Sequence, residues 1–323
     1  MTNTSETHTG RILHLQRLST EDGPGIRTTV FFKGCSLHCA WCHNPEAMSP
    51  HFQMQWLENQ CIGCNTCLSV CPLEGLYRDD DGLHIDRLAC LGCGICAEAC
   101  PANAMQRLGE DVSPADLAAE LLKDRPYFET SGGGVTLSGG EPAQQANFAL
   151  ELLAELRQVG IKTALDTCGL CSRSTLEKLA GQVDMVLYDL KLIDPEQHRH
   201  FTGQDNHIIL DNLRWLGEHI RAHGGPLLWV RTPLIPGATD SPANLAGIGA
   251  FLAAEIGPAL ERWELCAFNN LCRDKYRRLG LEWTYQDVPL YSQAQLEDFE
   301  RLARQSALPA EQVTVTGAAR MAE

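Results

Sequence analysis

Three cysteines near the N-terminus have the residue type and spacing of a ligand set for an iron–sulfur cluster. Cys35, Cys39 and Cys42 form C-x3-C-x2-C directly after the strand-like run TTVFFKG. Loops that bind electron-transfer clusters supply four cysteines. Three thiolates would leave one iron of a four-iron cubane without a protein ligand and open to a small molecule. The same spacing allows a zinc site completed by His38 or His43, or a damaged four-cysteine set.

Two further sets of four cysteines follow at once, each with the spacing C-x2-C-x2-C-x3-C-P, and the second begins 29 residues after the first. This is the bacterial two-cluster ferredoxin pattern, in which the fourth cysteine of each run ligates the other cluster. Eight thiols at such spacings favour clusters over zinc or disulfides. The crossed ligand sets are Cys61, Cys64, Cys67 and Cys100 for one cubane, and Cys71, Cys90, Cys93 and Cys96 for the other.

Alternating segments of strand and helix character must position these cysteines. Near-continuous apolar strands between amphipathic helices predict a parallel sheet, covered on its outer face and curved into a partial barrel. With the strand before Cys35, the pattern gives six strand–helix units, and the cysteine-rich block is an insertion after the first strand. Strands are expected at 134–140, 161–167, 183–191, 226–235 and 262–268, and helices at 142–159, 172–181, 206–223 and 242–255.

Composition excludes several classes of protein. The chain has 323 residues, a formal net charge of −15 and a mean hydropathy of −0.18. No apolar run approaches the ~20 residues of a membrane-spanning helix. The sequence also lacks the excess of basic residues that is typical of a nucleic-acid-binding protein. The polar start lacks the apolar core of a signal peptide, so we expect a cytoplasmic protein. Eleven of its 15 cysteines lie between Cys35 and Cys100, and we expect these to bind metal rather than form disulfides.

One stretch carries a family resemblance. DGPGIRTTVFFKGCSLHCAWCHNPE, from Asp22 to Glu46, resembles the opening of the radical S-adenosylmethionine enzymes that activate glycyl radical enzymes. The resemblance continues through SGGEP, DTCG, DLK and CAFNNLCRDKYRRLG over about 260 residues. It implies a partial (β/α)6 radical SAM barrel with an inserted two-cluster ferredoxin domain. The corresponding domain ranges are 16–49 for the start of the core, 50–108 for the insertion and 109–318 for the rest of the barrel.

The resemblance also implies an activity. In this family S-adenosylmethionine chelates the open iron, an electron cleaves its sulfonium–carbon bond, and the 5′-deoxyadenosyl radical takes a hydrogen atom from a glycine of a partner glycyl radical enzyme. The implied cofactors are three [4Fe-4S] clusters and S-adenosylmethionine. The implied partners are that enzyme and flavodoxin or ferredoxin as electron donor, and we expect a monomer that works under anaerobic conditions. Ferredoxin-bearing relatives favour partners other than the pyruvate enzyme.

By the same resemblance, the cofactor contacts lie at the carboxyl ends of the strands. Gly139 and Gly140 would admit the methionyl end, whereas charged groups would pair with its ammonium and carboxylate. Leu187 stands where some relatives place a methionine beside a bound monovalent cation, so a cation site here is doubtful. The expected cofactor contacts are Trp41, Cys42, His43, Gly139, Gly140, Glu141, Asp166, Asp189, Leu190, Lys191 and Asn269.

Several assignments stay open at this stage. The auxiliary clusters are either an electron relay or a structural and docking element. Arg231 contacts the cofactor, the partner or another side chain. Cys168, Cys171, Cys266 and Cys272 are interpreted as small buried hydrophobic residues. The alternative functions are a radical SAM dehydrogenase or maturase that uses the auxiliary clusters, and an electron carrier fused to a disabled barrel.

Overall fold

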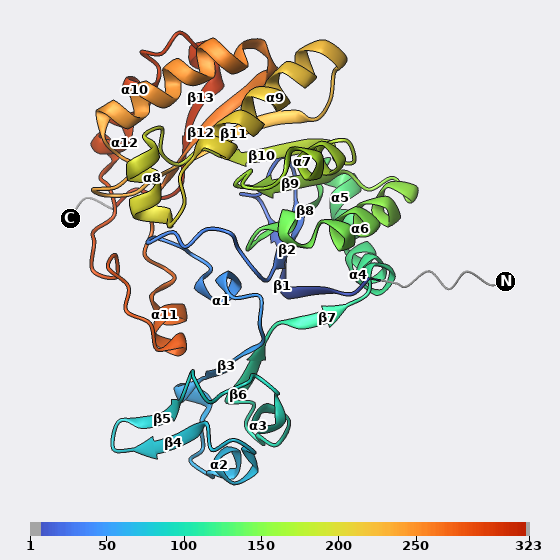
Figure 1. The fold of residues 1–323 in the computed structure, drawn as a ribbon, viewed down its shortest axis with the longest axis vertical. Helices are drawn as coiled ribbons and strands as arrows, with labels where there is room; N and C mark the ends of the chain where they lie inside the picture. Colours follow the sequence, from blue (N-terminus) through green and yellow to red (C-terminus); the bar gives the residue numbers. More distant parts are fainter. Residues whose placement is uncertain (1–7, 321–323) are drawn as a thin grey trace, which may run out of the picture.

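The computed structural model describes residues 8–320 and is built around one curved sheet of nine strands in the order β13-β12-β11-β10-β9-β8-β2-β1-β7 (Figure 1). From β2 to β13 all neighbouring strands are parallel, whereas β1 and β7 extend the other edge antiparallel. The sheet ends at β13 and β7 and forms a partial barrel. The parallel strands are β2 (Arg27–Phe32), β8 (Gly134–Gly139), β9 (Thr163–Thr167), β10 (Met185–Asp189), β11 (Leu227–Leu234), β12 (Leu260–Ala267) and β13 (Val313–Thr316).

The parallel strands are buried because helices cover their outer face. Every residue of β2 is buried, and the same is true of all but the last residue of β8. In Figure 1 the helices surround the outside of the curved sheet. Near-complete burial explains why these strands read as apolar runs rather than as an alternating pattern. The covering helices are α4 (Pro114–Leu121), α5 (Arg125–Ser131), α6 (Ala146–Gln158), α7 (Arg173–Ala180), α9 (His207–His223), α10 (Pro242–Phe251) and α12 (Gln293–Ala303).

The cysteine-rich insertion projects from the barrel, as the lower part of Figure 1 shows. The chain enters it through β3 (Gln53–Trp56) and returns through β6 (Met105–Leu108), and these two strands pair antiparallel. Its small core contains Met54, Leu76, Leu83 and Met105 with Cys67 and Cys96. The other insertion elements are α2 (Thr66–Val70), β4 (Leu76–Asp79), β5 (Gly82–Ile85) and α3 (Ile95–Glu98).

The sheet is larger than the sequence pattern predicts. All six expected strands are present, but β13 adds a seventh parallel strand, and β1 (Gly10–Ser19) begins six residues before the expected start of the core. β1 and β7 (Glu110–Val112) carry exposed polar residues, and β13 has four residues, so none of them has a long apolar signal. The helix expected over 142–159 starts as a 3-10 turn, and that over 242–255 ends in a π-helical turn at Leu252–Ile256.

No helix among residues 8–320 is long and apolar enough to cross a membrane.

Candidate active site

Most of the residues expected to bind cofactor converge at one rim of the barrel, since the carboxyl ends of parallel strands meet there. β2 leads directly into the loop that carries Cys35, and β8 ends at Gly139. β9 carries Asp166 near its end, and β10 ends at Asp189. β10 is hydrogen-bonded to β9 on one side and to β11 on the other, which places Asp189 opposite Arg231. The strand order therefore assembles the site from segments far apart in the sequence.

Two elements on opposite sides hold the cluster loop from Cys35 to Cys42. At one side, the His38 N–H donates to the Thr202 carbonyl at 2.8 Å, next to α8 (Pro195–Thr202). At the other side, the Tyr276 hydroxyl donates to the Cys42 carbonyl at 2.9 Å. Burial raises the pKa of each of the three thiols to about 12. The protein alone therefore keeps these thiols neutral, and a metal centre bound by them would displace their protons.

Lys191 places a positive charge beside this loop. Its side chain is only 9% exposed, and its ammonium forms an ion pair with the Asp189 carboxylate. Burial opposes the charge, but Asp189 and the neighbouring Cys39 raise the pKa of Lys191 above its usual value, so it stays protonated. Because alternate strand-end positions point to one face, both charged groups are presented to the same space.

Asp166 belongs to the same cluster of charged side chains. It accepts a hydrogen bond from the Ser138 hydroxyl at 2.6 Å, and an Arg231 nitrogen lies 3.8 Å from the same oxygen. Burial and the nearby Asp189 raise the pKa of Asp166 to about 7, although Arg231 opposes the shift. Arg231 also lies 3.0 Å from Glu264. Its guanidinium thus supplies fixed positive charge next to the two aspartates.

The SGGEP segment packs directly on the entrance to the cluster loop. A Cβ on Gly140 would lie 2.2 Å from the Gly34 carbonyl oxygen, and Gly139 has φ +101°. The Glu141 N–H donates to the same Gly34 carbonyl at 2.8 Å. Both Glu141 carboxylate oxygens accept hydrogen bonds from the next strand end, from the Thr167 hydroxyl and the Cys168 N–H. These bonds fix the orientation of the Glu141 carboxylate, and its contact with the cofactor stays a prediction.

His43 follows the last cysteine of the loop and is buried beside two aromatic rings. Its ring lies 6.5 Å from that of Phe268 and 6.4 Å from that of Trp283. Burial lowers the pKa of His43, opposed by a hydrogen bond to the Asn269 backbone. Its Nε2 is buried and has no hydrogen-bond partner within the described residues. The structure thus brings His43 and Asn269 together and leaves one polar atom available for a ligand.

Two other expected contacts are side chains of the hydrophobic core. Trp41 is buried against Phe201, with ring centroids 6.0 Å apart. Leu190 is fully buried in the same core. Its N–H donates to the Arg231 carbonyl, and its carbonyl accepts from the Thr232 hydroxyl. These bonds fix the direction of β10 at its end, which gives Leu190 a positioning role next to Lys191.

The four remaining cysteines are free and wholly or partly buried. Cys168 and Cys272 are buried, whereas Cys171 and Cys266 are half-buried. Cys168 lies beside the cluster loop, with its sulfur 3.8 Å from the Ser36 hydroxyl. Burial raises the pKa of all four thiols, which keeps them neutral.

In the insertion, the cysteines surround two separate cavities. One is lined by Cys61, Cys64, Cys67 and Cys100, and the other by Cys71, Cys90, Cys93 and Cys96. Each lining set contains three cysteines of one run and the fourth of the other. Among residues 8–320 no three His, Cys, Asp or Glu side chains come close enough to hold a single metal ion. The lining of the two cavities supports the crossed ligand sets.

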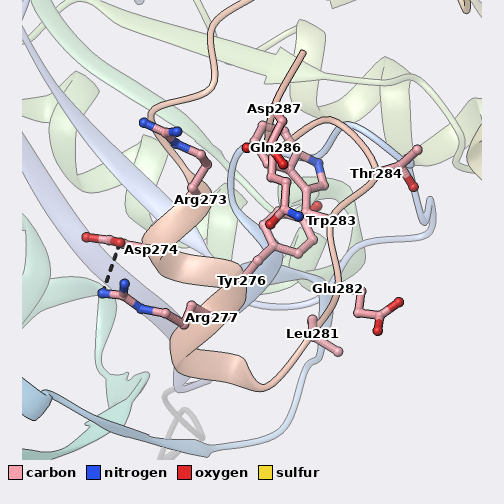
Figure 2. Close-up of a pocket in the computed structure, with 10 residues that line it drawn as sticks. All are labelled: Arg273, Asp274, Tyr276, Arg277, Leu281, Glu282, Trp283, Thr284, Gln286 and Asp287. Carbon is pink, nitrogen blue, oxygen red and sulfur yellow. Dashed lines mark ion pairs between the residues drawn. The ribbon is translucent and has the colours of Figure 1, made fainter.

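Sequence reasoning missed the role of α11 (Arg273–Leu279) and the loop after it. Tyr276 and Trp283 stack with ring centroids 5.1 Å apart, and the Trp283 indole N–H donates to the Ala40 carbonyl of the cluster loop at 3.1 Å. Lys275 forms an ion pair with Glu46 at 2.9 Å. Figure 2 shows the outer side of this contact, where the same two rings line a hollow of about 920 Å³ together with Arg273 and charged neighbours. The motif CRDKYRRLG marked the segment, but no local pattern indicated its contact.

Comparison with known proteins decides the family. The Radical SAM superfamily profile matches residues 87–246, a 4Fe-4S dicluster profile matches 60–104, and a 4Fe-4S single cluster profile matches 21–68. The trans-4-hydroxy-L-proline dehydratase activating enzyme of Clostridioides difficile is 39% identical over 90% of this chain and 95% of its own length. The choline trimethylamine-lyase activating enzyme of Oleidesulfovibrio alaskensis is 38% identical over 92% of this chain and 96% of its own length. The chain belongs to the radical SAM activating enzymes of glycyl radical enzymes.

Membership of the activating enzymes confirms the resemblance, the partial barrel and the oxidoreductase class. The pyruvate formate-lyase 2-activating enzyme of Escherichia coli is 38% identical over 95% of this chain and 92% of its own length. Among solved structures, a radical SAM methyltransferase from Sphaerobacter thermophilus shares the fold with a TM-score of 0.52 at 14% identity, over 94% of this chain and 76% of that one. Activating enzymes cleave S-adenosylmethionine at a [4Fe-4S] cluster and generate a glycyl radical.

Proposed function

We propose that this activating enzyme performs its chemistry at a cluster held by Cys35, Cys39 and Cys42, and that it carries two further cubanes in the insertion. The observation that carries the proposal is the position of a buried, charged Lys191 beside a three-thiol loop. When bound, the cluster and S-adenosylmethionine supply a 5′-deoxyadenosyl radical that takes a hydrogen atom from a glycine of the partner enzyme.

The residues of the rim bind and orient the cofactor. We assign the Lys191 ammonium to the carboxylate of S-adenosylmethionine, and Asp189 and Asp166 to its ammonium, because charge-assisted hydrogen bonds of this kind are strong and directional. The unpartnered Nε2 of His43 is available to the nucleoside end, and Asn269 beside it is assigned to the same end. Arg231 supplies positive charge next to the aspartates, which supports binding without a separate monovalent cation.

The partner is a glycyl radical enzyme on a separate chain, and the electron donor is flavodoxin or ferredoxin in the cytoplasm. We propose that the enzyme acts as a monomer, since one chain supplies every residue of the rim. The names of the relatives, which cover hydroxyproline dehydratase, choline lyase and isethionate lyase activation, define the panel of partners to be compared.

Anaerobic reconstitution tests this function. We expect about 12 irons per chain, four for each of three cubanes. Replacement of Cys35, Cys39 and Cys42 together by alanine should remove about four irons, all formation of 5′-deoxyadenosine and all glycyl radical signal in the partner. Cys171→Ala, a half-buried cysteine outside the ligand sets, serves as the control. Cofactor cleavage by the triple variant would refute the assignment.

A further inference from the structure

The two cavities of the insertion differ in their distance from the barrel. Met54 lines the cavity of Cys71, Cys90, Cys93 and Cys96, whereas Trp56 lines the cavity of Cys61, Cys64, Cys67 and Cys100. Both residues belong to β3, which leads away from the barrel, and a strand advances about 3.3 Å per residue. The first cavity, called here the inner cavity, therefore lies nearer the point where the chain leaves the barrel than the second, the outer cavity.

The inner cavity is also packed against the segment through which the chain leaves the barrel. A Cβ on Gly92 would lie 2.4 Å from the Phe52 carbonyl oxygen, and a Cβ on Gly94 would lie 3.3 Å from Arg107. These two glycines flank Cys93. The Phe52 ring in turn contacts two guanidinium groups, and its centroid lies 3.7 Å from the guanidinium of Arg11 and 4.5 Å from that of Arg107. Such cation–π contacts hold the ring in place.

The contacts continue from Phe52 to the N-terminal cluster loop. Arg11 donates to the Pro50 carbonyl at 3.1 Å, and a Cβ on Gly34 would lie 3.3 Å from Pro50. Gly34 directly precedes Cys35, whose N–H donates to the Met48 carbonyl at 3.1 Å. A continuous series of packed groups therefore joins Cys35 to Cys93.

The outer cavity is exposed to solvent, as is the side of the inner cavity formed by Leu91 and Cys93. Around Gly63, no atom of residues 8–320 beyond its chain neighbours lies within 4 Å of an ideal Cβ. Ile62 is 69% exposed, and Cys64 is an exposed cysteine. Arg78 lies with a guanidinium nitrogen 3.6 Å from the Cys61 sulfur. Hydrogen bonds to the sulfurs and exposure to solvent are among the factors that set the reduction potential of an iron–sulfur cluster.

We propose that the insertion is a one-way relay in which electrons enter at the cluster of the outer cavity and reach the N-terminal cluster through that of the inner cavity. This inference rests on the proposed function. Each cycle passes one electron: a low-potential one-electron donor protein is oxidised, and the electron breaks the carbon–sulfur bond of S-adenosylmethionine to give methionine and the deoxyadenosyl radical. Electron transfer slows steeply with distance. We therefore expect the electron to pass first through the cluster farther from the barrel and then through the nearer one.

Magnetic coupling between reduced clusters tests the order without any turnover. Cys64→Ala should remove the outer cluster and leave about eight irons, and Cys93→Ala should remove the inner cluster with the same iron content. In the fully reduced Cys64→Ala protein, we expect the electron paramagnetic resonance signal of the N-terminal cluster to stay broadened by its neighbour. In Cys93→Ala that broadening should be lost. Equal broadening in both, or loss only in Cys64→Ala, would overturn the order.

A glycine pair provides a test that keeps all three clusters. Gly92 and Gly63 have nearly the same backbone conformation, with φ +66° and +73°. Alanine at either position carries the same left-handed backbone strain. Only Gly92→Ala also meets the Phe52 carbonyl. We expect Gly92→Ala to weaken the coupling and to slow reduction of the N-terminal cluster by the donor protein at least about tenfold, whereas Gly63→Ala changes neither.

Chemical reduction separates this inference from the proposed function. With dithionite, which reaches the clusters directly, Gly92→Ala should still form 5′-deoxyadenosine at the rate of the unaltered enzyme. If dithionite supports no cleavage in the unaltered enzyme, the proposed function fails. If cleavage is normal but Gly63→Ala slows donor-dependent reduction as much as Gly92→Ala does, the relay order fails.

Discussion

The phenolic hydroxyl of Tyr276 donates to the backbone carbonyl of Cys42 at 2.9 Å, although the two residues are 234 positions apart. Burial raises the pKa of Tyr276 well above its usual value, so the group remains a donor over the whole working range of pH. Together with the Trp283 bond to Ala40, this contact places α11 behind the cluster loop. The C-terminal third of the chain thus determines the shape of an N-terminal ligand set.

Tyr276→Phe should loosen that loop. The change removes one hydrogen bond while keeping the stacked ring, and we expect it to lower the free energy of unfolding by about 1 kcal/mol. It should also speed the loss of about four irons to a chelator, measured anaerobically. Tyr285→Phe makes the same chemical change in the same aromatic cluster and should retain iron normally. Equal iron loss from the two variants would contradict the role of Tyr276.

Lys191→Met should weaken binding of S-adenosylmethionine. The variant leaves the Asp189 carboxylate without its partner, and breaking a buried charge pair costs about 2–5 kcal/mol. We expect the cofactor concentration for half-maximal 5′-deoxyadenosine formation to rise at least about tenfold, with unchanged iron content. Lys178→Met alters an exposed lysine of α7 and provides the control. An unchanged concentration dependence would show that Lys191 does not contact the cofactor.

Paired cysteine variants test the crossed ligand sets. Cys64→Ala and Cys100→Ala combined should remove one cluster and leave about eight irons, because both cysteines line the outer cavity. Cys96→Ala and Cys100→Ala combined should damage both auxiliary clusters and leave about four, although these two cysteines belong to the same run. The reverse result would mean that each run binds its own cluster.

Asp166→Asn should change the pH dependence of stability. Burial and Asp189 raise the pKa of Asp166 from 3.8 to about 7 in the folded protein. The folded state therefore binds more protons than the unfolded state between these values, and this group's contribution to stability falls as the pH rises from about 4 to about 7. We expect the variant to lose that fall and to be more stable at pH 8 by about 1 kcal/mol or more in urea unfolding. Asp80→Asn, at an exposed loop position, should leave the profile unchanged.

The sequence predicts those parts of the site that depend on local spacing. The triplet, the two quartets and the strand ends at Gly139, Asp166 and Asp189 follow from short motifs, because neighbouring residues fix which side chains share a loop or a strand face. The strands β1, β7 and β13 escape prediction, since half-exposed or short strands lack a long apolar run.

Long-range packing accounts for the rest of the site. The contact of Lys275 with Glu46 and that of Tyr276 with Cys42 form only when the barrel brings its two ends together, and no periodicity in either segment signals them. Glu141 is a similar case, because its motif resembles a cofactor contact while both its oxygens are bound to the next strand end. A charged residue in a motif indicates a function, but the motif does not show which group that residue contacts.

The pairing of β3 with β6 has a further consequence for the architecture. Because the outgoing and returning chains run side by side, residues 50 and 109 leave and rejoin the barrel at neighbouring points, and every parallel strand of the large sheet lies outside the excursion. The cysteine-rich segment can therefore be inserted or removed without changing the order of the parallel strands. Its removal would also cost α11 a neighbour, because the Arg87 guanidinium donates to the Arg278 carbonyl at 2.8 Å.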